Sequence, residues 1–246
     1  MIDYQSYINY IKLCCDNNNL ETFKSNPNFT WVLEHTSYNQ GLEYLEYSRK
    51  LFNISEKDIK FFCTINDEIG GPQKFDYDFA KVSPSSLRYI FHSNLILNYM
   101  KSLNLENINI CEIGGGYGGL CLAINYFSPN YNINISSYNI IDLYEITRLQ
   151  ENYLDYHKIK NVKYYDAFTY GEQIQDKDIF LISNYCFSEI EDEHQKLYIE
   201  KLFSKVSHGF MCWNHIKPYN FGFDYKEETE YPFTGNSVSQ NKYIYF

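Results

Sequence analysis

The sequence has no excess of basic residues, and this absence limits its partners. Among 246 residues, 21 Lys and Arg stand against 31 Asp and Glu, which gives a formal net charge of −10. Such a charge repels a polyphosphate backbone at long range, so nucleic acid is not expected as a partner. No run approaches the roughly 20 apolar residues that cross a bilayer, so a membrane partner is not expected either.

Signals for secretion, disulfides and metal binding are also missing. The stretch 1–6 lacks the basic and apolar regions of a signal peptide. The seven cysteines form no CxxC pair and show no repeated spacing, so neither a disulfide framework nor a zinc site is expected. No HxxxH spacing appears, and a metal requirement stays open. These absences favour a reducing, cytoplasmic compartment.

From residue 106 onward, segments of strand and helix character alternate. Apolar runs of strand type occupy 108–113, 133–141, 162–165, 179–183 and 210–213. The helical segment before the last of these runs carries the apolar residues Ile190, Leu197, Leu202 and Val206. This alternation predicts an α/β, Rossmann-like fold: a mostly parallel sheet with helices on both faces. The short tail leaves room for an antiparallel hairpin that completes a sheet of seven strands.

Residues 1–105 contain few strand-like runs, and we expect a separate helical region there. Tyr4, Tyr7 and Ile11 recur at helical spacing, and a second helix is expected over 41–52. Ser83-Pro84 predicts another helix start, because Ser can cap a helix and Pro fits its first turn. That helix is predicted to run to about Lys101. The expected domains are a helical cap, 1–105, and a cofactor-binding domain, 106–246.

A glycine-rich turn follows the first predicted strand of the second domain. Gly114, Gly116 and Gly119 satisfy the GxGxxG spacing, which is a weak signal for a dinucleotide site when it stands alone. Glu112 lies just before the first glycine and would repel the pyrophosphate of a dinucleotide. A ligand with positive groups would instead be compatible with this acid.

A second acid, Asp142, ends the next predicted strand. A carboxylate at that position can accept hydrogen bonds from both hydroxyls of a ribose. Asp142 therefore supports a nucleoside ligand, although it suits a nicotinamide cofactor as well as any other. The alternative is that the glycines form a plain tight turn and that Glu112 is a surface acid.

On these residues the chain resembles the class I S-adenosylmethionine (SAM)-dependent methyltransferases. The pattern E-x-G-x-G-x-G is formed by Glu112, Gly114, Gly116 and Gly118. A narrower resemblance, to a family of sugar O-methyltransferases, covers about residues 66–246. It is carried by Leu-Arg-Tyr at 87–89, Asn-Tyr-x-Phe-Ser-Glu at 184–189, and the segments 140–146 and 213–215.

The resemblance implies a SAM site whose product is S-adenosylhomocysteine. It places the methionine end at Glu112 and the glycines, and the ribose at Asp142. The remaining cofactor contacts that it implies are Leu143, Asp166, Ala167 and Asn184. Asp166 could equally be a solvated turn acid, since Asp is common in turns.

Methyl transfer to a sugar hydroxyl calls for a base, because such a hydroxyl is a poor nucleophile at neutral pH. The candidate bases are Glu189, His215 and His92. Glu189 has an alternative reading, because Ser188 and Glu191 form a capping-box pattern and acids are favoured in a first helical turn. We expect three other histidines, His157, His194 and His208, to be surface residues.

The acceptor is expected to meet Arg88, Tyr185 and Asn214. Arg88 and His92 are four residues apart on one predicted helix and therefore share a face. Arg88 could bind a carboxylate or a phosphate, or form a salt bridge between domains. The N-terminal region is expected to act as a lid, so deletion of 1–80 should spare SAM binding and abolish methyl transfer.

The sequence thus predicts a SAM-dependent O-methyltransferase that acts on a hydroxyl of a sugar or nucleotide-sugar in glycan biosynthesis. The alternatives are a methyltransferase of another small molecule, a non-catalytic SAM-fold binding module, and a nicotinamide oxidoreductase. Glu112 disfavours the last of these. A homo-oligomer stays open.

Overall fold

The structure, a computed structural model, describes residues 4–214, 221–234 and 240–246. The chain divides into two compact units, each made of several stretches. The first comprises Met1–Leu105, Gly116–Asn132 and Arg148–Lys160, and the second comprises Glu106–Gly115, Ile133–Thr147 and Asn161–Phe246. The predicted division into 1–105 and 106–246 stays a prediction.

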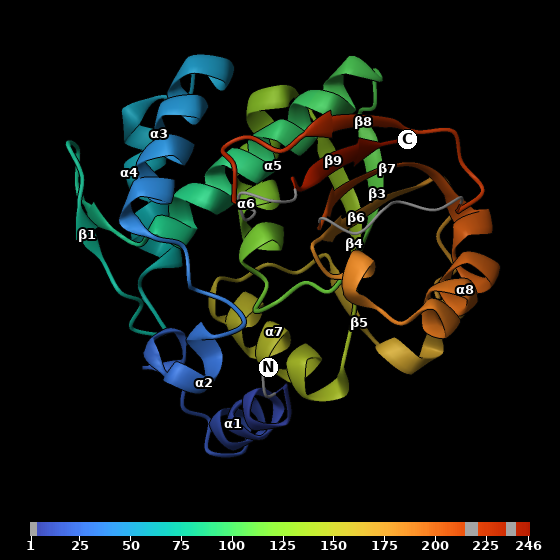
Figure 1. Ribbon diagram of the computed structural model, residues 1–246, viewed down its shortest axis with the longest axis horizontal. Coiled ribbons are helices and arrows are strands. Elements are labelled where there is room, and N and C mark those ends of the chain that lie inside the picture. The colour runs from blue at the N-terminus through green and yellow to red at the C-terminus, as the bar shows by residue number, and fades with distance from the viewer. Residues whose placement is uncertain (1–3, 215–220, 235–239) are drawn as a thin grey trace. The chain divides into compact units, whose positions relative to one another are not determined.

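The second unit contains a sheet of seven strands (Figure 1). Its order is β5-β4-β3-β6-β7-β9-β8, and β9 runs antiparallel to both of its neighbours, whereas the pairs from β5 to β7 are parallel. The strands are β3 (Asn107–Ile113), β4 (Asn134–Asp142), β5 (Val162–Asp166), β6 (Ile179–Asn184), β7 (Val206–Trp213), β8 (Lys226–Thr229) and β9 (Lys242–Tyr245). The predicted Rossmann-like, mostly parallel sheet of seven strands is confirmed.

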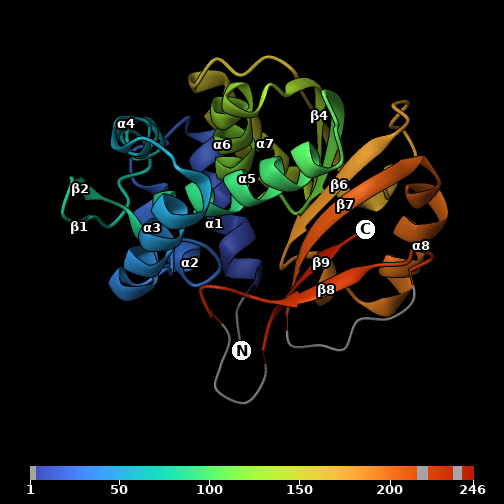
Figure 2. The ribbon, with the colours of Figure 1, turned by 90° about the horizontal axis from the view of Figure 1, so that it is seen from above.

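The helices of the second unit are short, and one of them differs from the prediction. Helix α8 (Asp192–Lys201) lies on one face of the sheet (Figure 2). Its Tyr198 packs with Cys111, Leu181 and other strand residues in one buried cluster. The assignment of Val206 to this helix is wrong, because Val206 begins β7. The 3-10 turns of this unit are Ala167–Thr169, Phe187–Glu189 and Phe203–Lys205.

The first unit is helical. Its helices are α1 (Tyr4–Asp16), α2 (Pro27–Thr30), α3 (Tyr38–Phe52), α4 (Glu56–Asn66), α5 (Pro84–Ser102), α6 (Gly119–Phe127) and most of α7 (Tyr144–Tyr156). It also holds the 3-10 turns Phe23–Ser25 and Ser128–Tyr131 and a two-stranded hairpin, β1 (Phe75–Asp76) with β2 (Lys81–Val82). The helical character predicted for the N-terminal region is confirmed.

Helix α5 begins as the sequence predicts. Ser83 is its N-cap, with an extended backbone and a side chain that accepts a hydrogen bond from the Ser85 amide, and Pro84 is its first residue. The Ser83 amide in turn donates to the buried carboxylate of Asp67, 2.7 Å away. The N-cap Ser83 is therefore held by two hydrogen bonds, one through its side chain and one through its backbone amide.

Candidate functional site

The glycine turn after β3 is built on positive backbone angles. Gly114 has φ +77°, and Gly116 and Gly118 also lie in the left-handed region. A Cβ added to Gly114 would stand 2.3 Å from both Cβ and Sγ of Cys186, which follows β6. Only glycine therefore fits at Gly114, for reasons of both conformation and space.

Glu112, near the end of β3, has a buried side chain. It is 1% exposed, and its Oε2 accepts a hydrogen bond of 2.8 Å from the Tyr138 hydroxyl on β4. Burial raises the pKa of Glu112 to about 8, and the nearby charge of Asp142 acts in the same direction. A positively charged ligand beside Glu112 would favour the ionised form of this carboxyl. A cationic ligand and the Glu112 carboxylate would therefore stabilise each other.

Asp142 and Asp166 stand opposite each other at the ends of β4 and β5. The Oδ1 of Asp142 accepts a hydrogen bond of 2.9 Å from the Leu143 amide. Asp166 caps the turn that begins at Ala167, because its Oδ1 accepts a hydrogen bond of 2.8 Å from the Phe168 amide. Both acids lie at the carboxyl edge of the sheet, where open α/β sheets place their ligands.

Four predicted site residues of the second unit gather at the ends of β6 and β7. Asn184 ends β6, and Tyr185 follows it with φ +65°. The Asn214 side chain, just after β7, donates a short hydrogen bond to the exposed carboxylate of Glu189. These residues therefore share one edge of the sheet with Asp142.

The capping-box reading of Ser188 is wrong. Glu191, not Ser188, is the N-cap of α8, and the Glu191 side chain makes no capping hydrogen bond. The Ser188 hydroxyl instead donates to the Tyr185 carbonyl and accepts a hydrogen bond from the Asn214 amide. Ser188 thus ties the segments after β6 and β7 together.

Two predicted site residues, Arg88 and His92, belong to the first unit, on α5. His92 is buried, edge-on to the Tyr44 ring at 5.6 Å. Burial, with a smaller contribution from Arg88, lowers the pKa of His92 to about 3. A base of such low pKa has little driving force to take a proton, which disfavours His92 as the base. His215 lies outside the described residues.

Sequence reasoning missed Glu230. It follows β8, is 2% exposed, and accepts a hydrogen bond from the Tyr185 hydroxyl. In the sequence it is one acid of the acidic stretch 227–230, and nothing in that stretch marks which acid is buried.

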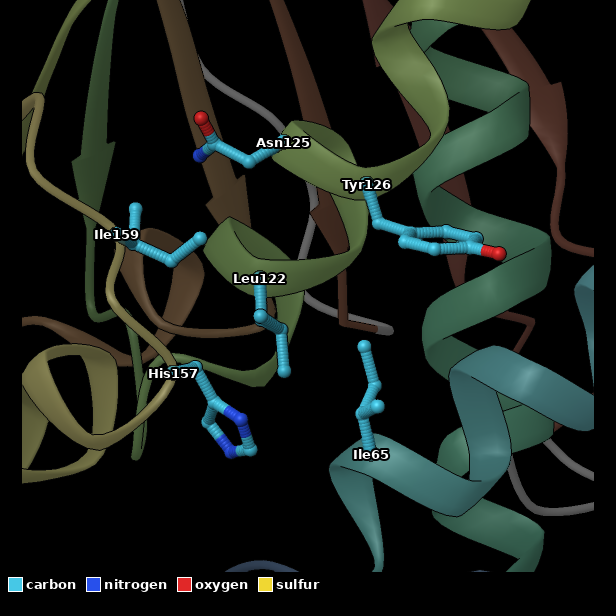
Figure 3. Close-up of a pocket in the computed structure, with 6 residues that line it drawn as sticks. All are labelled: Ile65, Leu122, Asn125, Tyr126, His157 and Ile159. Atoms are coloured by element: carbon cyan, nitrogen blue, oxygen red, sulfur yellow. The ribbon is translucent and has the colours of Figure 1, made fainter.

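The first unit also holds a small cavity of about 240 Å³ (Figure 3). Ile65 of α4 and Leu122 of α6 point toward each other across it. The expectation that His157 is a surface residue is wrong, because His157 lines this cavity and is half-buried. Burial lowers the pKa of His157 to about 4. The cavity is smaller than the roughly 300–1,000 Å³ of a typical ligand site and contains none of the predicted site residues.

The described residues form no cluster suited to a metal ion. Among residues 4–214, 221–234 and 240–246, no three His, Cys, Asp or Glu side chains come together in a way that could hold one. No helix in the described part of the chain is long and apolar enough to cross a membrane.

No protein-family model matches the chain, and no curated protein matches it. Among solved structures, it is similar to the methyltransferase domain of bacterial CtHen1-CN, with 9% identity, TM-score 0.48, and coverage of 63% of this chain and 96% of that one.

Two further solved structures are similar to the chain. One is a SAM-dependent methyltransferase from Clostridium acetobutylicum, with 14% identity, TM-score 0.40, and coverage of 62% and 70%. The other is a precorrin-6y C5,15-methyltransferase from Geobacter metallireducens, with 11% identity, TM-score 0.42, and coverage of 62% and 86%. All three likenesses are distant.

Proposed function

We propose that the chain is a SAM-dependent methyltransferase that methylates a hydroxyl of a sugar or nucleotide-sugar. The observation that supports SAM as the cofactor is the pair of acids at the ends of neighbouring strands. Glu112 is buried beside the glycine turn, and Asp142 ends the adjacent strand, close enough to raise the pKa of Glu112. Two acids suit a ligand with an ammonium, a sulfonium and a ribose, and they oppose a pyrophosphate.

The residues of the second unit fit this cofactor. Gly114 leaves no Cβ at the turn, and the carboxylate of Asp142 lies at the end of the neighbouring strand. In the proposed site, Asp142 holds the ribose hydroxyls, and Leu143, Asp166, Ala167 and Asn184 surround the rest of the nucleoside. When bound, SAM supplies the methyl group on a positively charged sulfur.

The chain's own contribution would be alignment and proton removal. An in-line displacement needs the acceptor oxygen, the methyl carbon and the sulfur in a row, so positioning carries much of the rate. Tyr185 and Asn214 would orient the acceptor from the second unit, and a role for Arg88 of the first unit stays a prediction. Glu189 and His215 remain the candidate bases.

Two experiments test this function. Isothermal titration calorimetry should show binding of SAM and S-adenosylhomocysteine and no binding of NAD. Mass spectrometry of a nucleotide-sugar panel incubated with enzyme and SAM should then reveal a product heavier by one methylene. Tight NAD binding without SAM binding would overturn the cofactor, and methylation of a non-sugar acceptor alone would overturn the substrate class.

A second candidate, methylation of another small molecule, rests on the same cofactor residues. It predicts the same calorimetry and a different acceptor in the product screen. Adding phenols and amines to the panel separates the two candidates.

A further inference from the structure

The end of β8 lies at the same sheet edge as the ends of β6 and β7. Trp213, the last residue of β7, stands opposite Lys242 of β9, and Lys242 stands opposite Thr229, the last residue of β8. Because β7 and β8 both run antiparallel to β9, they run in the same direction. Glu230, which follows Thr229, therefore emerges at the carboxyl edge of the sheet, where ligands bind.

The Glu230 carboxylate is buried and held by donors on both of its oxygens. Its Oε1 accepts from the Tyr185 hydroxyl. Its Oε2 accepts from the Thr234 amide at 3.0 Å, the Thr234 hydroxyl at 2.6 Å and the Asn241 side chain at 3.1 Å. Hydrogen bonds to an ionised acceptor are roughly twice as strong as neutral ones, so this set can hold a buried negative charge.

Tyr185 is fixed at both its backbone and its side chain. Its φ of +65° is costly for a residue with a Cβ, and its amide donates to the Cys212 carbonyl at 2.8 Å. Strained residues of this kind persist only where surrounding contacts hold them, and they concentrate at functional sites. The next residue, Cys186, lies against Gly114 of the glycine turn. The chain thus carries Tyr185 directly beside the proposed cofactor turn.

We propose that Tyr185 and Glu230 together receive the proton of the acceptor hydroxyl, an inference that rests on the O-methylation proposed above. The Tyr185 hydroxyl donates a hydrogen bond to Glu230. A phenolic hydroxyl is both a donor and an acceptor, so it can pass a proton from one partner to another. Tyr185 is the group that touches the acceptor, and Glu230 is a positioning residue and the final proton acceptor.

The step balances without any further reactant. The acceptor oxygen forms a bond to the methyl carbon as the bond from that carbon to sulfur breaks, and the electron pair stays on sulfur. The acceptor proton passes to Tyr185 Oη, and the Tyr185 proton passes to Glu230. The positive charge of the sulfonium and the negative charge of Glu230 disappear in the same step, so no net charge builds up at the site.

Glu189 offers the competing route, because it is also an acid at this edge. It differs from Glu230 in being exposed and bound to Asn214. The two acids can be distinguished by the same isosteric change, Glu230→Gln against Glu189→Gln. Glu227→Gln serves as the matched control, because Glu227 lies on β8 and its carboxylate faces Lys242 on the surface.

The test uses the full-length chain, SAM, and the hydroxyl acceptor found in the product screen. For Tyr185→Phe and Glu230→Gln, turnover should fall about 10²–10⁴-fold, whereas the dissociation constant of S-adenosylhomocysteine and the acceptor KM should change only a few-fold. Glu230→Asp, which keeps a carboxylate, should recover part of the lost turnover. Glu227→Gln should behave as wild type.

Tyr185→Phe guards against misfolding, because it leaves the Glu230 carboxylate with its donors from Thr234 and Asn241. The proposal is overturned if Glu189→Gln lowers turnover while Tyr185→Phe and Glu230→Gln do not. A loss confined to KM or to cofactor affinity would overturn it as well and leave a structural role. If the wild-type chain binds SAM yet methylates no hydroxyl, this proposal and O-methylation fall together, and the cofactor assignment stands.

Discussion

At the scale of single residues, the buried acid Glu112 should make stability depend on pH. Its pKa is about 8 in the folded chain, against an ordinary value of 4.5. The folded state therefore binds the proton of Glu112 more tightly than the unfolded state does. The stabilisation that this gives to the folded state is fully present below about pH 4.5. Between pH 4.5 and 8 this contribution is lost as the pH rises, by up to about 1.4 kcal/mol per pH unit.

Glu112→Gln should remove that dependence. Urea unfolding at a series of pH values should show the variant gaining on wild type as the pH rises from about 5 to about 8. Glu200→Gln, an exposed acid, serves as the control and should follow wild type. Curves for wild type and Glu112→Gln that stay parallel across this range would contradict the prediction.

Asp142 should matter for the cofactor and little for the fold. Asp142→Asn keeps an oxygen that can accept from the Leu143 amide but removes the charge offered to the ribose hydroxyls. Hydrogen bonds to a charged group contribute about 1.5–3 kcal/mol, so affinity for S-adenosylhomocysteine should fall roughly 10- to 150-fold. Calorimetry measures this directly, with the surface residue Asp155→Asn as control. An unchanged affinity would show that Asp142 does not bind the ribose.

Site residues that adjoin a strand end could be predicted from the sequence, whereas one whose role depends on burial could not. Glu112 and Asp142 could be found because each ends an apolar run, and the end of a parallel strand is where ligands bind. Glu230 could not, because its neighbouring acids look alike in sequence and only the pairing of β8 with β9 determines which one is buried. The burial of His92 was missed because its surroundings come from α3, which is distant in sequence.

At the scale of elements, the turn after β3 should tolerate no side chain at its first glycine. In Gly114→Ala, the new Cβ combines a left-handed backbone with a 2.3 Å approach to Cys186. Gly222→Ala isolates the conformational part, because Gly222 has φ +88° and, within the described part of the chain, no atom lies within 4 Å of the place a Cβ would take. That control should cost about 1–2 kcal/mol of unfolding free energy.

Gly114→Ala should cost more than this control and weaken S-adenosylhomocysteine by at least about tenfold. The double variant Gly114→Ala/Cys186→Gly should recover part of the loss, because it removes the steric contact and leaves the backbone strain. Thermal unfolding and calorimetry on these variants measure both effects. Equal losses for Gly114→Ala and Gly222→Ala would show that Cys186 plays no part.

Elements were predicted best where a local signal marks them. Ser83-Pro84 predicted the start of α5 to the residue, because the cap and the proline act within one turn. Helix α4 was not predicted, although Ser55 caps it. The strand β7 was expected to begin later than it does, because apolar Val206 fits a helical stripe as well as a strand, and only pairing with Ile179 decides the matter.

At the scale of the whole molecule, the N-terminal helices share a core with later parts of the chain. Phe23 packs edge-on against Tyr117 at 5.6 Å and against Tyr153 at 6.4 Å. The Lys24 ammonium lies 4.3 Å from the centre of the Tyr117 ring, and burial lowers the pKa of Lys24 to about 8. Deletion of 1–80 would therefore uncover the core of the first unit, and it is a poorer test of a lid than the sequence suggested.

A single substitution tests this shared core more cleanly. Phe23 is fully buried, so Phe23→Ala should lower the free energy of unfolding by about 3–5 kcal/mol, the usual cost of removing a buried aromatic ring. Trp31→Ala provides the control, because Trp31 is 73% exposed and its loss should cost less than about 0.5 kcal/mol. Urea unfolding, followed by far-ultraviolet circular dichroism of the helices, reports on both variants. If Phe23→Ala unfolds as wild type does, the N-terminal helices contribute little to the core, and deletion of 1–80 becomes a fair test of the lid.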